Sequence, residues 1–189
     1  MHSMMASPRP HVPASDSVEL ARWLSLIVAV ATVMAAMSVA LDLTADQNRP
    51  LVLGLSLLGL PLAAGLRRWG GRLPAAWFAW ALLPGLMAQL AAGIYLSGEI
   101  ANPANTFFLL AILYSAYFFG RATALAHLLL AGALYGAALL AIGGPLAASL
   151  DRWAFTIGVA VLIGGVVAAL RDGLVERAAT DPLTGVLNR

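Results

Sequence analysis

The sequence contains no cysteine and no lysine, and charged residues make up only 11% of its 189 residues. Without cysteine, the chain forms neither disulfides nor thiolate metal sites. Hydrophobic residues account for 61% of the chain, and the mean hydropathy is +0.86. A water-soluble domain of this length needs a polar shell that this composition cannot supply. The sequence therefore predicts an integral membrane protein in contact with lipid.

The basic residues are eleven arginines, which give a formal net charge of +2 against nine acidic residues. They are scattered near the ends of apolar segments and form no continuous basic stripe. Proteins that bind nucleic acids concentrate positive charge on one face, so no nucleic-acid partner is expected. Arginine at the ends of apolar segments instead determines on which side of a membrane each loop lies.

Apolar segments recur along the chain at about 23–41, 51–66, 75–96, 106–119, 122–142 and 153–170. Lipid offers no hydrogen bonds to the backbone, so each crossing segment should be helical. The predicted fold is all-α, a polytopic membrane bundle of about six transmembrane helices. The fourth segment is short for a crossing, so we expect it to begin nearer Ile100 or to lie tilted. If it does not cross, a five-span protein results, with its termini on opposite sides.

Arginine is distributed unequally between alternate loops. The N-terminus, the second and fourth connections and the C-terminal tail contain Arg9, Arg22, Arg67, Arg68, Arg72, Arg121, Arg171 and Arg177, whereas the other connections contain Arg49 and Arg152. Cytoplasmic loops carry the excess of basic residues in membrane proteins. Both termini of a six-span chain are therefore predicted to be cytoplasmic.

The chain divides into four predicted parts. Residues 1–20 are rich in proline and serine and should be a disordered cytoplasmic N-terminus. Residues 21–170 form the membrane domain, whose first segment we interpret as a retained anchor and not a cleaved signal peptide. Residues 171–180 are expected to continue the last span as a cytoplasmic helix. Asp181 precedes a proline and is a good N-cap, so a new helix should start there.

The last nine residues, DPLTGVLNR, resemble the D-x-L-T-G-x-x-N-R opening of GGDEF domains, the diguanylate cyclases. The matching residues are Asp181, Leu183, Thr184, Gly185, Asn188 and Arg189. Chance agreement at all six positions is on the order of one in 10⁷ to 10⁸ per starting point with uniform residue usage. The stretch also follows a helix that is predicted to leave the last span on the cytoplasmic side.

The resemblance implies the membrane sensor region of a diguanylate cyclase in a bacterial cytoplasmic (inner) membrane. Cyclases of this family condense two GTP molecules to cyclic di-GMP, and two facing domains each hold one GTP with a divalent metal such as Mg²⁺. Their catalytic, nucleotide-binding and metal-binding residues follow the matched stretch. We therefore expect no catalytic residue, cofactor site or metal site within residues 1–189, and the chain as given should not be an enzyme.

Two alternative functions differ in class from this one. A small transporter or channel would need polar or charged groups along a pathway, and charged residues within the apolar segments are lacking. The same sensor architecture feeding another output, such as an adenylate cyclase, conflicts with the C-terminal motif.

Small residues at four-residue spacing allow helix backbones to approach closely. Gly132 and Gly136 form a GxxxG motif in the fifth segment, which is compatible with packing inside one chain or between two. In the sixth segment, Gly164 with Ala168 and Gly165 with Ala169 repeat the pattern. Because the sixth segment leads into the linker, a homodimer is predicted there, with Ile163, Val167, Leu170 and Leu174 as a short coiled-coil seam.

Polar residues that could form a ligand mouth gather on the outer side of the third and fourth segments. They are Gln89, Tyr95, Glu99, Asn102 and Asn105. The stimulus itself, a small molecule or a property of the membrane, is not specified by these residues. His127, the one histidine within a span, is interpreted as a hydrogen-bonded packing residue, because a bis-histidine haem site would need a second ligand.

Overall fold

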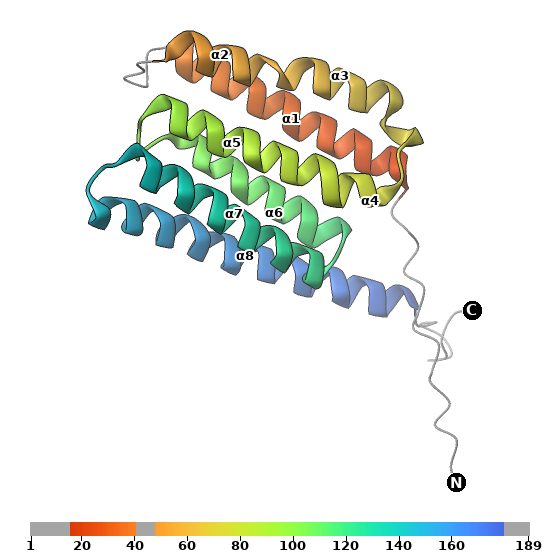
Figure 1. Ribbon diagram of the computed structural model, residues 1–189. Coiled ribbons are helices and arrows are strands. Elements are labelled where there is room, and N and C mark those ends of the chain that lie inside the picture. Colours follow the sequence, from red (N-terminus) through yellow and green to blue (C-terminus); the bar gives the residue numbers. More distant parts are fainter. Residues whose placement is uncertain (1–15, 41–47, 180–189) are drawn as a thin grey trace.

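The computed structural model describes residues 16–40 and 48–179, which form helices and no strand (Figure 1). The α-helices are α1 (Ser17–Ala40), α2 (Arg49–Leu57), α3 (Gly59–Trp69), α4 (Ala75–Trp77), α5 (Leu83–Ser97), α6 (Thr106–Phe118), α7 (Arg121–Ile142) and α8 (Leu146–Ala179). Two 3₁₀ turns, η1 (Gly70–Arg72) and η3 (Pro103–Asn105), and a π-helical turn, η2 (Phe78–Leu82), complete these segments. The predicted all-α bundle is confirmed.

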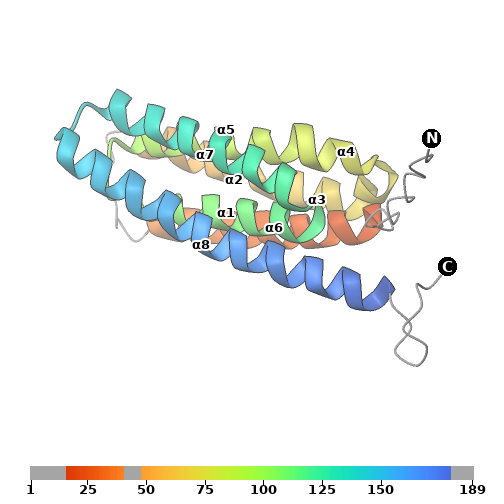
Figure 2. The same ribbon diagram turned by 90° about the horizontal axis from the view of Figure 1, so that it is seen from below.

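The helices pack side by side as antiparallel rods. Helix α1 packs on the broken rod of α2 and α3, α4 and α5 continue each other through η2, and α6, α7 and α8 pack together. Figure 1 shows the start of α1 and the end of α8 at the same end of the bundle. In Figure 2, α8 runs along the outside, and its C-terminal part extends past the neighbouring helices.

Five described helical segments are long and apolar enough to cross a membrane: Ser17–Val39, Arg49–Arg72, Ala75–Ser97, Arg121–Ile142 and Leu146–Arg177. Large apolar side chains cover the outside of these rods. For example, Leu129, Phe155 and Leu162 are each more than 60% exposed. A water-soluble protein rarely exposes a continuous apolar surface of this kind, whereas a lipid-facing bundle requires one. The model therefore supports a multi-pass membrane protein.

The fourth rod, Pro103–Phe118, is shorter than the others. Its α-helical part has 13 residues and would rise about 20 Å, less than the roughly 30 Å of a hydrocarbon core. The rod begins at Pro103, nearer Ile100 than the apolar segment does, because a turn occupies residues 98–102 and the Asn102 side chain caps η3 at Pro103. Half or more of α6 is buried against other helices, so protein rather than lipid surrounds it.

Two helices begin earlier than the sequence indicated. Helix α1 begins at Ser17, within the stretch predicted to be disordered, because the Asp16 carboxylate accepts a hydrogen bond from the Val18 N–H at 3.0 Å and caps the helix. Helix α8 begins at Leu146 and not near 153, so the connection from α7 is only Gly143–Pro145. As expected, α8 continues without a break through residues 171–179.

Prolines interrupt two rods. Pro61 has no N–H to give the Leu57 carbonyl, and α2 ends at Leu57. Pro84 follows the π-helical turn η2, in which the Leu83 N–H bonds to the Phe78 carbonyl. Both interruptions lie inside segments long enough to span a membrane.

Candidate functional site

An apolar cavity of about 330 Å³ lies between the N-terminal helices α1 and α2 and the central helices α5 and α6. At one end it is lined by aliphatic side chains such as Leu24, Val28 and Leu83. At the end where α5 turns into η3, it is lined by Ser97 and Asn102. Within residues 16–40 and 48–179, the lining contains no Arg, Asp, Glu or His side chain. The cavity is therefore an uncharged space with one more polar end.

Of the residues predicted to form a ligand mouth, two line this cavity. Gln89 donates from Nε2 to the Leu55 carbonyl at 2.7 Å and thereby joins α5 to α2. Asn102 is buried, donates to the Ser97 hydroxyl at 2.7 Å and accepts a hydrogen bond from the Ala104 N–H at 2.9 Å. The side chain of Tyr95 is 51% exposed and is not part of the lining.

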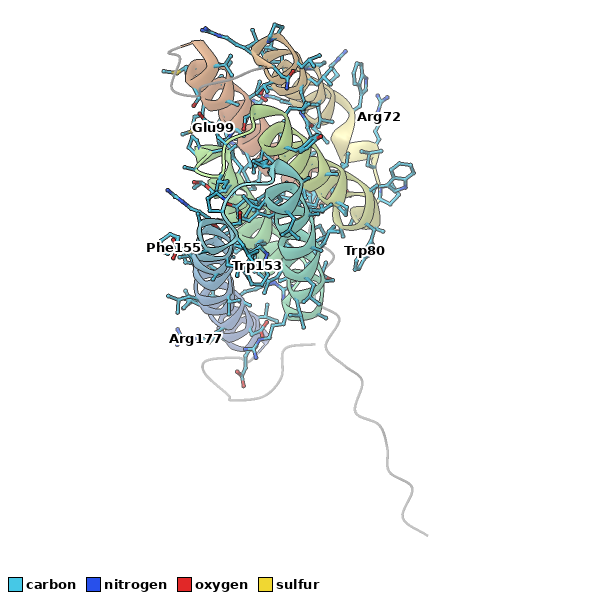
Figure 3. The ribbon with its side chains drawn as sticks, turned by 60° about the vertical axis from the view of Figure 1, so that its left-hand side comes forward. Arg72, Trp80, Glu99, Trp153, Phe155 and Arg177 are labelled. Carbon is cyan, nitrogen blue, oxygen red and sulfur yellow. The ribbon has the colours of Figure 1, made fainter. Side chains whose placement is uncertain are left out.

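The other two residues of the predicted mouth lie elsewhere. Asn105 donates to the Tyr135 hydroxyl at 3.3 Å and to the Thr156 hydroxyl at 3.0 Å, and so joins the start of α6 to α7 and α8. Glu99 lines a shallow depression between the α5–α6 connection and Gly143. Figure 3 shows Glu99 well apart from Arg72, the last residue of η1. The structure thus divides the predicted mouth between four environments.

Helix α6 separates the cavity from α8. Its Ala111 and Tyr114 side chains line the cavity. Its Ile112 side chain faces α8, where a Cβ placed on Gly164 would lie 3.1 Å from the Ile112 Cγ2 atom. One turn further along, Ala116 packs with Ala168 in a buried cluster. A displacement of α6 by an occupant of the cavity would therefore act directly on α8.

Buried polar groups join α6, α7 and the π-helical turn. His127 is 1% exposed, with Nδ1 2.7 Å from the Ser115 hydroxyl and Nε2 2.7 Å from the Ala79 carbonyl. Because a carbonyl only accepts, Nε2 carries the proton and donates to Ala79, and Nδ1 of the neutral ring accepts from Ser115. The interpretation of His127 as a hydrogen-bonded packing residue is confirmed.

The reason for this contact is a missing donor in the α4–α5 rod. The Leu83 N–H bonds to Phe78, so in the same register the Ala79 carbonyl would need an N–H from residue 84. Residue 84 is proline and has none. His127 supplies the missing donor, which matters because an unpaired carbonyl inside a membrane protein is costly.

The GxxxG motif of α7 receives a side chain from α8. The Trp153 indole lies against Gly132 and Gly136, and its Nε1 donates to the Gly132 carbonyl at 2.8 Å. Figure 3 shows Trp153 on the α7 side of α8 and Phe155 on its outer side. In the described chain, these two glycines thus serve packing between two helices of the same molecule.

The small residues of α8 divide between two faces of the helix. Gly164 and Ala168 are buried against α6. Gly165 is exposed, and a Cβ placed there would meet no other part of the described chain within 4 Å. On the exposed side lie also Leu170 and Leu174, which are 63% and 60% exposed.

Charged side chains hold α8 where it leaves the bundle. The Arg121 Nε atom lies 2.6 Å from the Asp172 carboxylate, and the Arg171 Nη1 atom lies 3.5 Å from it. The Arg171 guanidinium also lies over Gly120, 3.1 Å from the position that a Cβ would take. Gly120 has φ +86° and ψ −178°, a conformation that favours glycine. The α6–α7 turn is therefore in direct contact with the beginning of the C-terminal extension of α8.

The GGDEF-like residues Asp181, Leu183, Thr184, Gly185, Asn188 and Arg189 lie outside the described residues. Within the described ranges, no group of three or more His, Asp or Glu side chains gathers in a way that could hold a metal ion. The chain matches no known family model, no curated protein and no solved structure.

Sequence reasoning missed the partners of His127 and the role of Trp153. Ser115 and Ala79 carry no signal of their own, since serine is common in membrane helices and any backbone carbonyl can accept. Pro84 was a usable signal, because a proline inside a span always leaves a carbonyl in need of a donor. Trp153 stands at the start of the apolar segment 153–170, and only the structure shows it opposite the glycines of α7.

Replacing His127 with leucine should destabilise the bundle by about 1–3 kcal/mol, because the Ala79 carbonyl and the Ser115 hydroxyl lose their partner. Restoring an N–H with Pro84→Ala should recover part of this loss in the His127→Leu background. The measurement is the free energy of unfolding in detergent micelles, with Leu129→Ala on the exposed side of α7 as control. If the effects of the two substitutions are simply additive, the missing-donor explanation is wrong.

Proposed function

We propose that this chain is the membrane sensory and anchoring region of a diguanylate cyclase. The observation that carries the proposal is the DPLTGVLNR stretch, which resembles the opening of a GGDEF domain and begins two residues after the end of α8. A cytoplasmic cyclase domain that starts at Asp181 would bind GTP and Mg²⁺ and make cyclic di-GMP. The membrane bundle would supply anchoring, dimerisation and a response to a stimulus.

The shape of α8 supports a role in signal transmission. The helix has 34 residues and would extend about 50 Å, which exceeds the roughly 30 Å of a hydrocarbon core. It therefore projects from the bundle toward the GGDEF-like stretch. An unbroken helix passes on rotation or translation, whereas the Asp-Pro pair after it favours a break about which a following domain can pivot.

The arginines of the described helices support an orientation with the end of α8 in the cytoplasm. Arg22, Arg67, Arg68, Arg72, Arg121, Arg171 and Arg177 belong to the helix ends that Figure 1 shows on one side of the bundle, and Arg49 and Arg152 belong to the opposite side. By the positive-inside rule, the side rich in arginine is cytoplasmic. This side is where GTP is available.

Reporter fusions after Arg72, Asn102 and Arg189 should report the cytoplasm, the outside and the cytoplasm, respectively. The expectation follows from the arginine asymmetry together with a fourth rod that crosses the bilayer within the bundle. A paired alkaline phosphatase and fluorescent-protein reporter at each site provides the measurement. An outside signal at Arg189 would rule out a cytoplasmic cyclase domain.

A homodimer through the exposed face of α8 is part of the proposal. Gly165 lies on this face and would allow two α8 helices to approach closely. The Ile112 side chain of the same chain packs against Gly164, so Gly164 is not open to a second helix. Leu170 and Leu174 continue the face toward the linker.

Gly165→Ile should reduce dimer cross-linking in native membranes, because the larger side chain separates the two backbones. Contacts between membrane helices are often worth about 1 kcal/mol, so a partial loss is expected. Ala137→Ile, on the exposed side of α7, is the control and should leave the yield unchanged. An unchanged yield in Gly165→Ile, with normal expression, would place the interface on another helix.

The phase of the cytoplasmic extension should control cyclase output. In a fusion of residues 1–189 to a GGDEF catalytic domain, inserting three or four helix-forming residues after Leu174 should alter cyclic di-GMP production. Inserting seven should largely restore it, because the seam realigns after a heptad. Production that declines steadily with insertion length, or ignores it, would show that the extension is only a tether.

The size of the response depends on the energy that a stimulus supplies. A stimulus shifts the populations of two arrangements of the protein from 1:99 to 99:1 only if it binds one arrangement more tightly than the other by roughly 5.5 kcal/mol. A typical coupling energy of about 1–3 kcal/mol would bias the populations without switching them completely.

A further inference from the structure

The cavity between α1, α2, α5 and α6 has the size of a small-molecule site. Its volume of about 330 Å³ falls in the range of roughly 300–1,000 Å³ that ligand pockets occupy. It also reaches the outside of the bundle, since Met34 of α1 is part of its lining and is 54% exposed. A molecule dissolved in the surrounding lipid can therefore enter it from the side.

The lining of the cavity disfavours a charged occupant. Among the residues that the structure describes, no Arg, Asp, Glu or His side chain faces the cavity, and an unpaired ion inside a membrane domain is costly. Leu24, Val28, Leu83 and Leu86 line the part nearest the arginine-rich end. This part extends about 12 Å along α1 from Leu24 to Thr32, at 1.5 Å per residue. A single hydrocarbon chain would fit this aliphatic part of the cavity.

Of the two side-chain amides in the wall, Gln89 and Asn102, one has an oxygen that the described protein does not use. Gln89 uses its Nε2 to donate to Leu55, and its Oε1 accepts no hydrogen bond from the described chain. The amide oxygen and the nitrogen of Asn102 are both engaged, with Ala104 and Ser97. The unused amide oxygen at the border between the aliphatic part and the polar part is therefore Gln89 Oε1, which can accept a hydrogen bond from a donor such as a hydroxyl group.

We infer that the cavity binds an uncharged single-chain amphiphile from the lipid phase, with its hydroxyl head donating to Gln89 Oε1 and its chain against the aliphatic part. The occupant would contact Ala111 and Tyr114 on one face of α6, and the other face of α6 packs on Gly164 and Ala168 of α8. A role for this occupant as the stimulus rests on the proposed sensory function, whereas its binding does not.

Binding is tested on the full chain in native membranes with a photoreactive medium-chain primary alcohol. Cross-linked peptides should come from the cavity-lining parts of α1 and α5, and unlabelled alcohol should compete. Gly93→Phe should reduce labelling at least about fivefold, because Gly93 lines the cavity and has room for a side chain beside Leu55. Ala92→Phe, one residue earlier and exposed, should label like the unaltered chain.

The head group is tested with Gln89→Met, which keeps the length of the side chain and removes the acceptor. Labelling by the alcohol should weaken about fivefold, the effect of one hydrogen bond. The methyl ether of the same probe has no donor, so it should label the unaltered chain and Gln89→Met equally. If labelling by the alcohol and by the methyl ether falls equally in Gln89→Met, Gln89 only supports the fold, and the head-group assignment fails.

Three further outcomes would overturn the inference. Labelling without competition would indicate bulk lipid contact, and undiminished labelling in Gly93→Phe would place the site elsewhere. Labelling by the matched carboxylate probe as strong as by the alcohol would contradict the selection against charge. None of these measurements uses cyclase activity, so they leave the proposed function to be decided separately by cyclic di-GMP production in the fusion.

Discussion

Every backbone carbonyl in a lipid-exposed bundle needs a hydrogen-bond donor, and the arrangement of this protein depends on that constraint. Helices satisfy it internally along most of the chain. At Ala79, the π-helical register and Pro84 together leave a carbonyl without a donor, and His127 from α7 supplies one. Ser115 of α6 then donates to the other ring nitrogen. A local defect in one rod thus determines how three rods are held relative to one another.

Helix α6 lies between the cavity and α8 and contacts both. It is short and largely buried, with the cavity on one face and α8 on the other. Tyr114 adds a second attachment, because its hydroxyl donates to the Leu20 carbonyl at the start of α1. Packed interiors transmit displacement because they leave little empty space. The contacts of Ile112 and Ala116 with the small residues of α8 therefore make α8 sensitive to the position of α6.

The distribution of contacts along α8 explains how one helix can belong to the bundle and also act beyond it. Trp153 anchors its first part to α7, and Gly164 and Ala168 attach its middle to α6. The last attachment is at Arg171 and Asp172, beside the α6–α7 turn. This surface ion pair contributes little energy by itself. The position of the ion pair matters more, because the pair ties α8 to the start of α7 at the point where the C-terminal part of α8 leaves the described bundle.

The positions of the rods were largely predictable from the sequence. Long apolar runs, interior prolines and arginines at segment ends are local signals, and they located the six rods and both interruptions. The start of α8 was placed seven residues too late, because Trp153 and the charged pair Asp151 and Arg152 suggested a membrane boundary. The grouping of Gln89, Asn102 and Asn105 into one mouth followed from their similar depth. The structure places Gln89 and Asn102 at one cavity and Asn105 away from it, because depth along a helix does not specify the direction in which a side chain points.

The sequence by itself determined the class of protein, since a composition so poor in charge cannot cover a water-soluble surface. It also supplied the motif on which the proposed cyclase function rests, because that signal is a string of neighbouring residues. Only the tertiary structure decided which glycine of α8 is buried and which is exposed, which carbonyl His127 satisfies, and where the cavity lies. These properties depend on the rotation of each helix about its own axis. That rotation is set by contacts between residues far apart in the chain, such as Ile112 with Gly164 and Ala79 with His127.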